Sequence, residues 1–302
     1  MEPDNKNSLD SFLTQAMGVA PSVLRWPQEF LLGQSELPAV FDPHNALLTV
    51  VGACATEISE SILAPVLAAA RQPDGCCSRL LVFARQLDQE SWSEMGFQHE
   101  GIIAGYWPDG SSAELWARQW GERNAGSLKE SATVELVGAS PGTIPGPLPA
   151  NWICRVAQPD DAEHIRDLLR LVFPNYPIAD DPGSLRYALA MELVHGRLVC
   201  NAEGQLIAYA AWEFQGSTSA VELADCATNP LARKRGLMAY LVQRLQEDLE
   251  DVFAGRVGYC LARDDQPAMQ AVLIRSGWKP KGYLRTQFRM DDRWISARLW
   301  CP

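Results

Sequence analysis

Three cations stand immediately before a glycine at the start of a predicted helix. Arg233, Lys234 and Arg235 are followed by Gly236 and then by an apolar-periodic segment. A helix that opens directly from a loop leaves about four backbone N–H groups without intrahelical partners, and its dipole makes that end partly positive. Glycine lets a ligand approach the backbone closely. Together these features predict a cradle for a pyrophosphate group.

The alternative for the same residues is a solvated basic turn. Cations at the N-terminus of a helix oppose its dipole, which costs about 0.3–1 kcal/mol for each badly placed charge. A bound anion would remove that cost. We therefore favour the cradle over the solvated turn.

The cradle needs a strand before it and a helix after it, and the sequence predicts both. The strand covers 221–228, and the helix covers 237–252 with leucine at every fourth position. The other predicted elements are strand 152–157, a helix capped by Asp160 that runs to about 172, helix 184–194, a hairpin within 197–214, strand 257–261, helix 267–276 stopped by Gly277, and strands 278–290 and 295–300. This order, β-α-α-β-β-β-α-β-α-β-β, indicates an α/β fold with a mixed sheet.

A segment rich in proline and glycine, residues 141–151, predicts a boundary between two domains. The chain has 302 residues, which is room for two domains. We expect an N-terminal extension over 1–36 with a short amphipathic helix near 9–17, a first domain over 37–140, the linker, and a second domain over 152–302.

Composition disfavours several classes of function. The net charge of -11 opposes binding to nucleic acid. No apolar run approaches the roughly 20 residues of a membrane helix, and the acidic start is not a secretory signal. The eight cysteines contain no CxxC, and the four histidines have no metal-ligand spacing. We expect a cytoplasmic protein with reduced thiols, no metal, and no nucleic-acid or membrane partner.

The first predicted domain contains a faint copy of the second half of the second domain. "GACAT" (52–56) echoes "ADCAT" (224–228), "EMGFQHEGII" (94–103) echoes "RSGWKPKGYL" (275–284), and "AELW" (113–116) echoes "ARLW" (297–300). The order and spacing agree, although coincidence among short apolar words is the alternative. The first copy lacks the basic glycine loop. We therefore expect it to be structural or to shape the substrate site.

The basic loop resembles the signature of a known superfamily. Arg233-Lys-Arg-Gly236-Leu-Met238 is similar to the (Arg/Gln)-x-x-Gly-x-(Gly/Ala) pattern of the GNAT acetyltransferases, with Met238 in place of the final small residue. The resemblance implies a GNAT fold over 152–302, preceded by a smaller degenerate GNAT-like α/β domain, with acetyl-CoA as co-substrate. The pantetheine arm would lie along strand 221–228. The implied cofactor-binding residues are Cys226, Ala227, Thr228, Arg233, Lys234, Arg235, Gly236, Leu237 and Met238.

Most of the chain beyond about residue 38 resembles the β-lysine N-acetyltransferases. "VFPNYPIADDP", "VELADCATNPLARKRGLMAYL", "GFQHEGIIAGYWPDG" and the ending "RSGWKPKGYL…RLW" carry this resemblance. It implies acetylation of the distal amine of β-lysine. Arg285 and Thr286 stand where the family has an Asn pair, and Ile295 lies where its closing segment has a Glu. Arg285 therefore suggests a more anionic or differently shaped acceptor. Tyr176 is a candidate for lining the acceptor pocket, the alternative being packing on the core.

Amine acetylation needs a base, because an alkylammonium has a pKa of about 10. Glu222 is our candidate for the base, and Asp225 is a candidate contact for the substrate ammonium. Strand alternation places the two on opposite faces unless a bulge intervenes. The alternatives are an exposed carboxylate at Glu222 and a hydrogen bond from Asp225 to nearby backbone.

The sequence offers weaker candidates for the remaining steps. Leu273 stands where GNAT enzymes often carry the tyrosine that protonates the leaving thiolate. Tyr283 is our candidate in its place, with Tyr259 and water as alternatives. A main-chain amide within 223–226 would stabilise the tetrahedral intermediate. We disfavour Cys226 as a nucleophile, because no histidine is near it in sequence and cysteine is commonly a small buried hydrophobe.

These features predict an acetyl-CoA-dependent N-acetyltransferase. The expected acceptor is a small-molecule amine, either a β-lysine-like compound or another diamino acid. The alternatives are a non-catalytic acyl-CoA-binding sensor and an acyltransferase that uses a longer acyl donor. The oligomeric state, with a homodimer among the alternatives, and any ligand of the N-terminal domain are left open by the sequence.

Overall fold

The structure is a computed structural model that describes residues 28–32, 37–58, 63–64, 77–85, 88–120, 123, 146–173, 182–290 and 293–302. Its strands are β1 (Gln28–Leu32), β2 (Leu37–Asp42), β3 (Leu47–Val51), β4 (Arg79–Ala84), β5 (Gln98–Ile103), β6 (Ala113–Gln119), β7 (Ile153–Val156), β8 (Val194–Cys200), β9 (Leu206–Phe214), β10 (Ala220–Thr228), β11 (Val257–Arg263), β12 (Lys279–Met290) and β13 (Arg293–Cys301). Its helices are α3 (Gln89–Glu94), α4 (Ala162–Val172), α5 (Pro182–Ala190), α6 (Leu237–Asp251) and α7 (Pro267–Arg275). Short 3-10 turns are η1 (Ala55–Glu57), η2 (Pro159–Asp161) and η4 (Pro230–Ala232).

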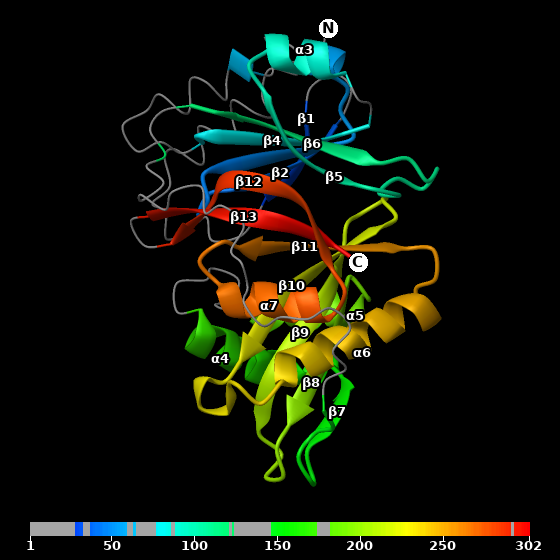
Figure 1. The fold of residues 1–302 in the computed structure, drawn as a ribbon, viewed down its shortest axis with the longest axis vertical. Coiled ribbons are helices and arrows are strands. Elements are labelled where there is room, and N and C mark those ends of the chain that lie inside the picture. The colour runs from blue at the N-terminus through cyan, green and yellow to red at the C-terminus, as the bar shows by residue number, and fades with distance from the viewer. Residues whose placement is uncertain are drawn as a thin grey trace, which may run out of the picture. The chain divides into compact units, whose positions relative to one another are not determined.

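The element order predicted for 152–302 is confirmed, and so is the mixed α/β class (Figure 1). Two predicted boundaries are wrong. The residue at the N-cap of α4 is Asp161 instead of Asp160, because the turn η2 precedes the helix. Helix α5 ends at Ala190, four residues earlier than predicted, and β8 starts at Val194. The short helix predicted near 9–17 lies outside the described residues.

The chain divides into two compact units. One comprises Met1–Ile103, Ser111–Leu128 and Tyr283–Ser296, and is called unit 1 below. The other, unit 2, comprises Ala104–Gly110, Lys129–Gly282 and Ala297–Pro302. The domain boundary expected at 141–151 stays a prediction, since residues 124–145 are outside the described part of the chain.

Unit 2 is built on the strand order β11-β10-β9-β8-β7, and residues 297–300 of β13 pair antiparallel with β11. Helices α6 and α7 pack on one face of these strands, where Leu241 and Leu245 are fully buried against Trp212. The indole N–H of Trp212 donates to the backbone oxygen of Leu245 at 2.7 Å. Helices α4 and α5 pack on the other face, around Ile165 and Leu169. The leucine stripe predicted for α6 is therefore its core face.

Unit 1 repeats part of this construction. In both units a parallel pair of strands is associated with a following helix: β3 and β4 precede α3, and β10 and β11 precede α7. The helix ends match closely. Gly96 and Gly277 both have positive φ, at 77° and 87°, and each precedes an N–H that bonds back five residues to the helix. This is a Schellman-type ending, which glycine allows because it has no Cβ. The echoes read in the sequence are therefore structural.

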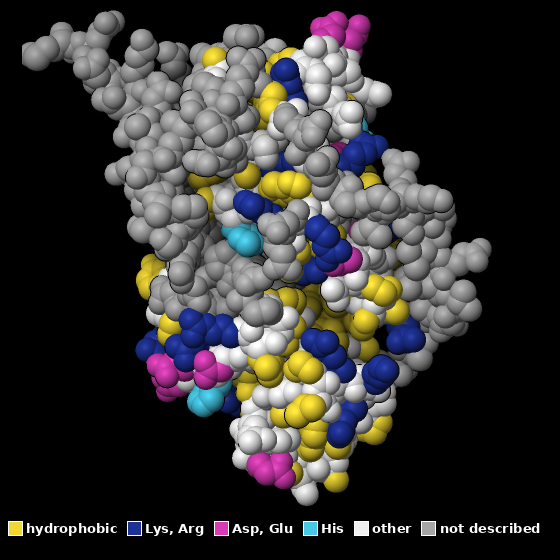
Figure 2. All heavy atoms as spheres, turned by 90° about the vertical axis from the view of Figure 1, so that its left-hand side faces the viewer, with side chains coloured by type: hydrophobic (Ala, Val, Ile, Leu, Met, Phe, Trp, Pro, Cys, Tyr) yellow, Lys and Arg dark blue, Asp and Glu magenta, His cyan; other side chains and the backbone are white. Residues whose placement is uncertain are grey.

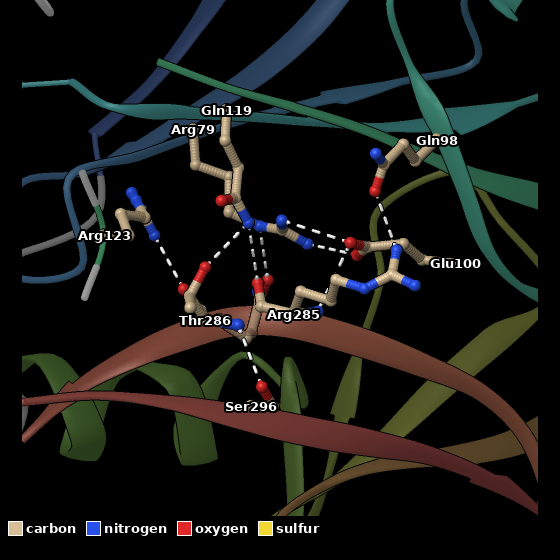
Figure 3. A network of polar contacts seen from close by, with 9 residues as sticks. Arg79, Gln98, Glu100, Gln119, Arg123, Arg285, Thr286 and Ser296 are labelled. Carbon is tan, nitrogen blue, oxygen red and sulfur yellow. Dashed lines mark hydrogen bonds and ion pairs between the residues drawn. The ribbon is translucent and has the colours of Figure 1, made fainter. Parts of the chain in front are cut away.

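A buried ion pair lies in unit 1, as Figure 3 shows. Arg79 on β4 is fully buried and pairs with Glu100 on β5. The Nε of Arg79 also donates to Gln287 on β12 at 3.1 Å. These contacts join three strands of the unit by charge-assisted hydrogen bonds, which are stronger than neutral ones.

Charged side chains are distributed over the surface. Figure 2 shows Lys and Arg side chains at several separate places on one face, with acidic side chains in fewer groups. Within the described residues, none of the helices has the length and apolar character to cross a membrane.

Candidate active site

The parallel strands β10 and β11 separate halfway along their length. Their ladder consists of three pairs and ends at Glu222 and Tyr259. Strand β10 nevertheless continues to Thr228, and β11 continues to Arg263. On the side toward β11, the backbone of 223–228 therefore lacks ladder partners, although its other side stays paired with β9. An unpaired strand edge of this kind can hydrogen-bond an extended ligand.

The loop that follows β10 leads directly into α6. Gly236 is the N-cap residue, with φ 77° and ψ 6°, and no side chain caps the helix. The first backbone N–H to bond within α6 is that of Tyr240, which donates to the Gly236 oxygen at 3.0 Å. The N–H groups of Leu237, Met238 and Ala239 are thus left for a ligand. A helix N-terminus of this kind favours an anion.

Glycine is needed at 236 for its backbone conformation, not for protein packing. A Cβ placed there would meet nothing within 4 Å. Lys234 also has positive φ, at 65°. Two left-handed residues in a short loop turn successive N–H groups toward one side, as in anion-binding nests. The open space above Gly236 fits a ligand that approaches the backbone.

The three loop cations are exposed and carry no carboxylate partner among the described residues. Arg233 donates to the backbone oxygen of Thr228 at 3.4 Å. The guanidinium of Arg235 lies 5.8 Å from the ring centroid of Trp152. Their charges are thus not neutralised by the described part of the protein. The loop predicted to be a cradle thus combines exposed cations with an uncapped helix N-terminus, which favours an anion.

A β-bulge interrupts β10 between Ala224 and Ala227. Two residues of β10, Asp225 and Cys226, stand opposite one residue of β9, and Asp225 has φ 52°. The bulge changes the alternation of side chains along β10. Before it, Glu222 points to the α4/α5 face; after it, Ala227 belongs to that face. A bulge, the exception to strand alternation that the sequence allowed, is therefore present in β10.

Glu222 is partly buried and receives a hydrogen bond from the hydroxyl of Tyr259 at 3.0 Å. Burial raises the pKa of Glu222 to about 7; the Tyr259 hydrogen bond lowers the pKa, and the charge of Asp225 raises it. A carboxylate with a pKa near neutrality is suited to accept a proton. Tyr259 is buried, and burial raises its pKa well above the ordinary value. With so high a pKa, Tyr259 would release its proton poorly as a general acid. It still donates a hydrogen bond to Glu222 and orients that carboxylate.

Glu213 on β9 stands directly opposite Glu222 in the antiparallel register. Glu213, Glu222 and Tyr259 therefore form a row across three neighbouring strands. The pKa of Glu213 is raised well above its ordinary value by burial and by the charges of Asp225 and Glu222. The corresponding row of unit 1 is Ala39, Val50 and Val82, all buried. The acidic row is thus a feature of unit 2.

Unit 1 also lacks the strand separation. Its parallel strands β3 and β4 pair along the whole of β3, from Leu47 to Val51, and the N–H of Gly52 continues the pairing to Phe83 at 2.8 Å. No strand edge is freed there within the described residues. This agrees with the absence of the basic loop from the first sequence copy.

Cys226 lies beside the bulge, and its Sγ contacts the Ala224 oxygen at 3.7 Å. Burial, followed by the charge of Asp225, raises the pKa of the thiol well above its usual range. Because the thiolate is the nucleophilic form, this environment disfavours an acyl-cysteine route.

Three sequence candidates are not among the described residues of unit 2. Tyr176 lies outside the described residues. Tyr283 on β12 is partly buried and belongs to unit 1. Arg285 also belongs to unit 1, where its guanidinium donates to Gln98 at 2.7 Å and its backbone N–H to Glu100 at 3.3 Å (Figure 3). The roles of all three stay predictions.

Sequence reasoning missed Glu213 and the buried Tyr209. The signal for Glu213 was a hairpin: "EF" and "VE" flank the segment QGSTSA, whose Gly, Ser and Thr favour a turn. Pairing Phe214 with Val221 places Glu213 opposite Glu222, as the structure has it. No local signal identifies Tyr209, because its environment depends on the register of three strands.

The strand separation, the bulge and the basic helix N-terminus follow one another within one stretch of unit 2. Residues 163–278 match the acetyltransferase (GNAT) family. This stretch runs from α4 to the start of β12 and contains the whole of β10, the loop and α6. Residues 163–278 are therefore similar to a GNAT acetyltransferase domain, which supports an N-acetyltransferase activity.

Two named relatives are similar to this chain, one over most of its length and the other over about half. N-acetyltransferase YodP of Bacillus subtilis is 26% identical over 251 residues, which cover 80% of this chain and 87% of that protein. Beta-lysine N(6)-acetyltransferase of Methanosarcina mazei is 24% identical over 157 residues, which cover 51% of this chain and 56% of that protein. Among solved structures, spermidine N-acetyltransferase from Vibrio cholerae in complex with CoA and spermine has 15% identity and a TM-score of 0.44, covering 51% of this chain and 96% of that one.

Proposed function

We propose that the chain transfers the acetyl group of acetyl-CoA to the amine of a small, amino-acid-like metabolite of the cytoplasm. The observation that carries the proposal is the separation of β10 from β11 beyond Glu222, which leads to the cradle at Gly236. A thioester at the point of separation would lie beside a carboxylate. A diphosphate would lie at the other end, beside three cations.

The residues present fit the co-substrate. The N–H groups of Leu237 and Met238, with Arg233, Lys234 and Arg235, would hold the diphosphate oxygens. The free edge of β10, including Cys226, Ala227 and Thr228, would pair with the amides of the pantetheine arm. The thioester supplies the acetyl group and a leaving thiolate.

Glu222 is proposed as the general base. It accepts a proton from the ammonium of the acceptor, and the neutral amine nitrogen then attacks the carbonyl carbon of the thioester. The new C–N bond forms as the C–S bond breaks, and the sulfur leaves as a thiolate that takes up a proton. Backbone N–H groups in the bulge, within 223–226, are proposed to stabilise the oxyanion. Tyr283 or water is proposed to protonate the sulfur.

A β-lysine-like diamino acid is the proposed acceptor. The named activity of the Methanosarcina mazei relative supports this class. The carboxylates of Glu222 and Asp225 suit an ammonium group, because opposite charges attract strongly where water is excluded. Asp225 is proposed as an additional ammonium contact.

Turnover with a panel of amines tests the proposal. Purified protein is mixed with acetyl-CoA and, in turn, β-lysine, L-lysine, ornithine and 1,4-diaminobutane, and thiol release is recorded. We expect turnover with at least one diamino acid, and a loss of about 10²–10⁴-fold in kcat for Glu222→Gln. The exposed Glu250→Gln on α6 is the matched control, with unchanged turnover. Tight acetyl-CoA binding without turnover would indicate a sensor instead, and turnover only with a longer acyl-CoA would change the donor.

A further inference from the structure

Two carboxyl groups face each other across β9 and β10. Glu213 and Glu222 are a directly opposed cross-strand pair, and both are partly buried. Side chains at such positions have Cβ atoms about 4.5–5.5 Å apart, and like charges there destabilise the sheet. Among the described residues, neither carboxylate has a Lys or Arg partner. A pair of this kind lowers its energy either by holding a proton or by binding a cation.

A buried hydroxyl lies on the same strand as Glu213. Tyr209 is four residues before Glu213 on β9, on the same face of the sheet. The side chain is fully buried, and its hydroxyl has no hydrogen-bond partner among the described residues. Its ring lies over Gly196: a Cβ on that glycine would come within 2.6 Å of the hydroxyl oxygen. An unpaired buried hydroxyl costs about 1–3 kcal/mol, so its retention favours a ligand group as partner.

The direction of the Tyr209 hydroxyl follows from the register. Gly196 on β8 stands opposite Ala211, whereas Leu198 stands opposite Tyr209 itself. The ring therefore leans toward the row of Ala211 and over β8, on the side of β9 away from Glu222. Burial raises the pKa of the hydroxyl, and the charges of Asp225 and Glu213 raise it further. The hydroxyl thus lies within the electrostatic influence of Glu213, on the β8 side of the pair.

The groups around the pair are acidic or phenolic. Strand β9 contributes Tyr209 and β10 contributes Asp225, while β11 contributes Tyr259. The segment before β6 contributes Tyr106, whose pKa is raised by burial and by the charge of Glu222. On β8, the residue opposite Glu213 is Val194. The charged groups that act on the pair are therefore all negative.

We propose that Glu213 and Glu222 act as one carboxylate pair that shares a proton in the empty site and releases it when the ammonium of the acceptor binds between them. This inference rests on the proposed acetyl transfer. The bound ammonium has three N–H donors, and the four oxygen atoms of the two carboxylates offer acceptors for them. Before attack, one proton passes from the ammonium nitrogen to a carboxylate oxygen. The pair then carries one proton again, and the nitrogen carries a lone pair.

The pair is a stronger base than Glu222 alone. A doubly ionised pair binds its first proton more tightly than an isolated carboxylate, because the proton relieves repulsion between the two charges. The transfer from an alkylammonium of pKa about 10 is correspondingly less uphill. Glu213 thus has two roles: it contacts the ammonium, and it raises the proton affinity of the pair. The pair also favours a cationic acceptor over a neutral alcohol, because a neutral alcohol does not relieve the repulsion between the two carboxylates.

Calorimetry in buffers of different ionisation enthalpy counts the protons that move on binding. The probe is β-lysine, or the best acceptor of the amine panel, added to the CoA-bound protein near pH 8. We expect release of about one proton per acceptor bound by the wild type. In Glu213→Gln, Glu222 alone with a pKa of about 7 is mostly ionised at this pH, and we expect release of about 0.1 proton. Equal proton release in both would overturn the proposal.

Two further variants separate a proton-sharing role from a structural one. Glu213→Asp retains the carboxyl group and should restore most of the proton release. Glu250→Gln, exposed on α6, should release protons as the wild type does. CoA affinity should be unchanged in all of them, because Glu213 lies outside the cradle. A loss of CoA affinity in Glu213→Gln would indicate misfolding. In that case the proton release of Glu213→Asp tests the proposal: a release close to that of the wild type supports it, and a release of about 0.1 proton in a variant that binds CoA normally contradicts it.

The shared proton is also measurable without an acceptor. Infrared spectra of the wild type near pH 8 should contain a band of a protonated carboxyl group that Glu213→Gln lacks. Absence of that band from the wild type would refute the pair even if acetyl transfer is active. Presence of the band without turnover on any amine would instead refute the proposed function and retain the pair.

Discussion

Glu222 and Tyr259 are the last residues that β10 and β11 pair, and the Tyr259 hydroxyl donates to Glu222 at 3.0 Å. One relationship thus joins the point where the strands separate to the carboxylate that stands there. The hydrogen bond favours the ionised form of Glu222 and lowers its pKa, against the effects of burial and of Asp225. Tyr259 therefore keeps Glu222 usable as a base near neutral pH.

Removal of that hydrogen bond should move the acidic limb of the pH profile. The wild type should lose kcat/KM as the pH falls through about 7, because Glu222 becomes protonated. Tyr259→Phe removes an interaction with the ionised form, so the limb should move to higher pH. Activity near pH 7 should then fall several-fold and converge with the wild type at alkaline pH. Profiles of thiol release measure this.

The exposed Tyr187 provides the control for this substitution. Tyr187→Phe should leave the profile unchanged. A Tyr259→Phe limb that stays in place, or moves to lower pH, would contradict the assigned role of Tyr259.

Gly236 should be needed for CoA binding beyond its contribution to stability. Gly236 and Gly255 both have positive φ, 77° and 89°, and a Cβ on either meets nothing within 4 Å. Each change to alanine should therefore cost a similar free energy of unfolding, about 1 kcal/mol. Only Gly236→Ala should weaken CoA binding, by about tenfold or more, since its Cβ enters the cradle. Thermal unfolding and calorimetry with CoA distinguish the two effects, and equal CoA affinities would rule out the cradle.

The loop cations should oppose folding and favour binding. Arg233, Lys234 and Arg235 are exposed at the N-terminus of α6, where positive charge opposes the helix dipole. Changing all three to serine should raise the free energy of unfolding by about 0.3–1 kcal/mol at low salt for each removed charge that opposes the dipole. The same change should lower CoA affinity and flatten its salt dependence. A variant that loses stability while it keeps CoA affinity would contradict the proposed role.

Much of the fold is readable from the sequence because glycine and leucine carry local signals. The leucine period predicts α6 to within one residue, and Gly277 ends α7 as expected. The end of α5 was missed because Glu192, with φ 56°, occupies the left-handed position where glycine is usual. The N–H of Leu193 bonds back to Ala188 there, and no residue type announces it.

The site is less readable, because it depends on register. Asp225 adopts a left-handed conformation in the bulge, again without glycine. The opposition of Glu213 and Glu222 requires the pairing of β9 and β10, and the position of Tyr209 over Gly196 requires β8 as well. Residue types and spacing predicted the base and the anion loop, whereas the partners of the base come from three strands.

The unusual protonation of Glu222 should appear in the stability of the protein. Its pKa rises from an ordinary value of 4.5 to about 7 on folding. The folded state then binds more protons than the unfolded state between these values, so its contribution to stability falls as the pH rises through this window. Glu222→Gln has no such dependence. The stability of the variant relative to wild type should therefore increase from pH 5 to pH 8, as urea unfolding would show; a constant difference would mean that Glu222 titrates normally.

Removal of one partner of the buried pair of Arg79 and Glu100 should destabilise the protein strongly. Replacement of both partners by apolar residues should destabilise it much less. The exposed fractions of their side chains are 0% and 2%, so a lone charge at either position cannot be solvated by water. Glu100→Ala should lower the free energy of unfolding by about 3–5 kcal/mol, whereas the double change Arg79→Met, Glu100→Leu should recover most of that loss. The exposed pair of Arg186 and Glu163 provides the control, since Glu163→Ala should cost less than about 1 kcal/mol. Urea unfolding measures all four proteins, and equal losses for Glu100→Ala and the double variant would show that the unpaired charge of Arg79 is not the cause of the loss.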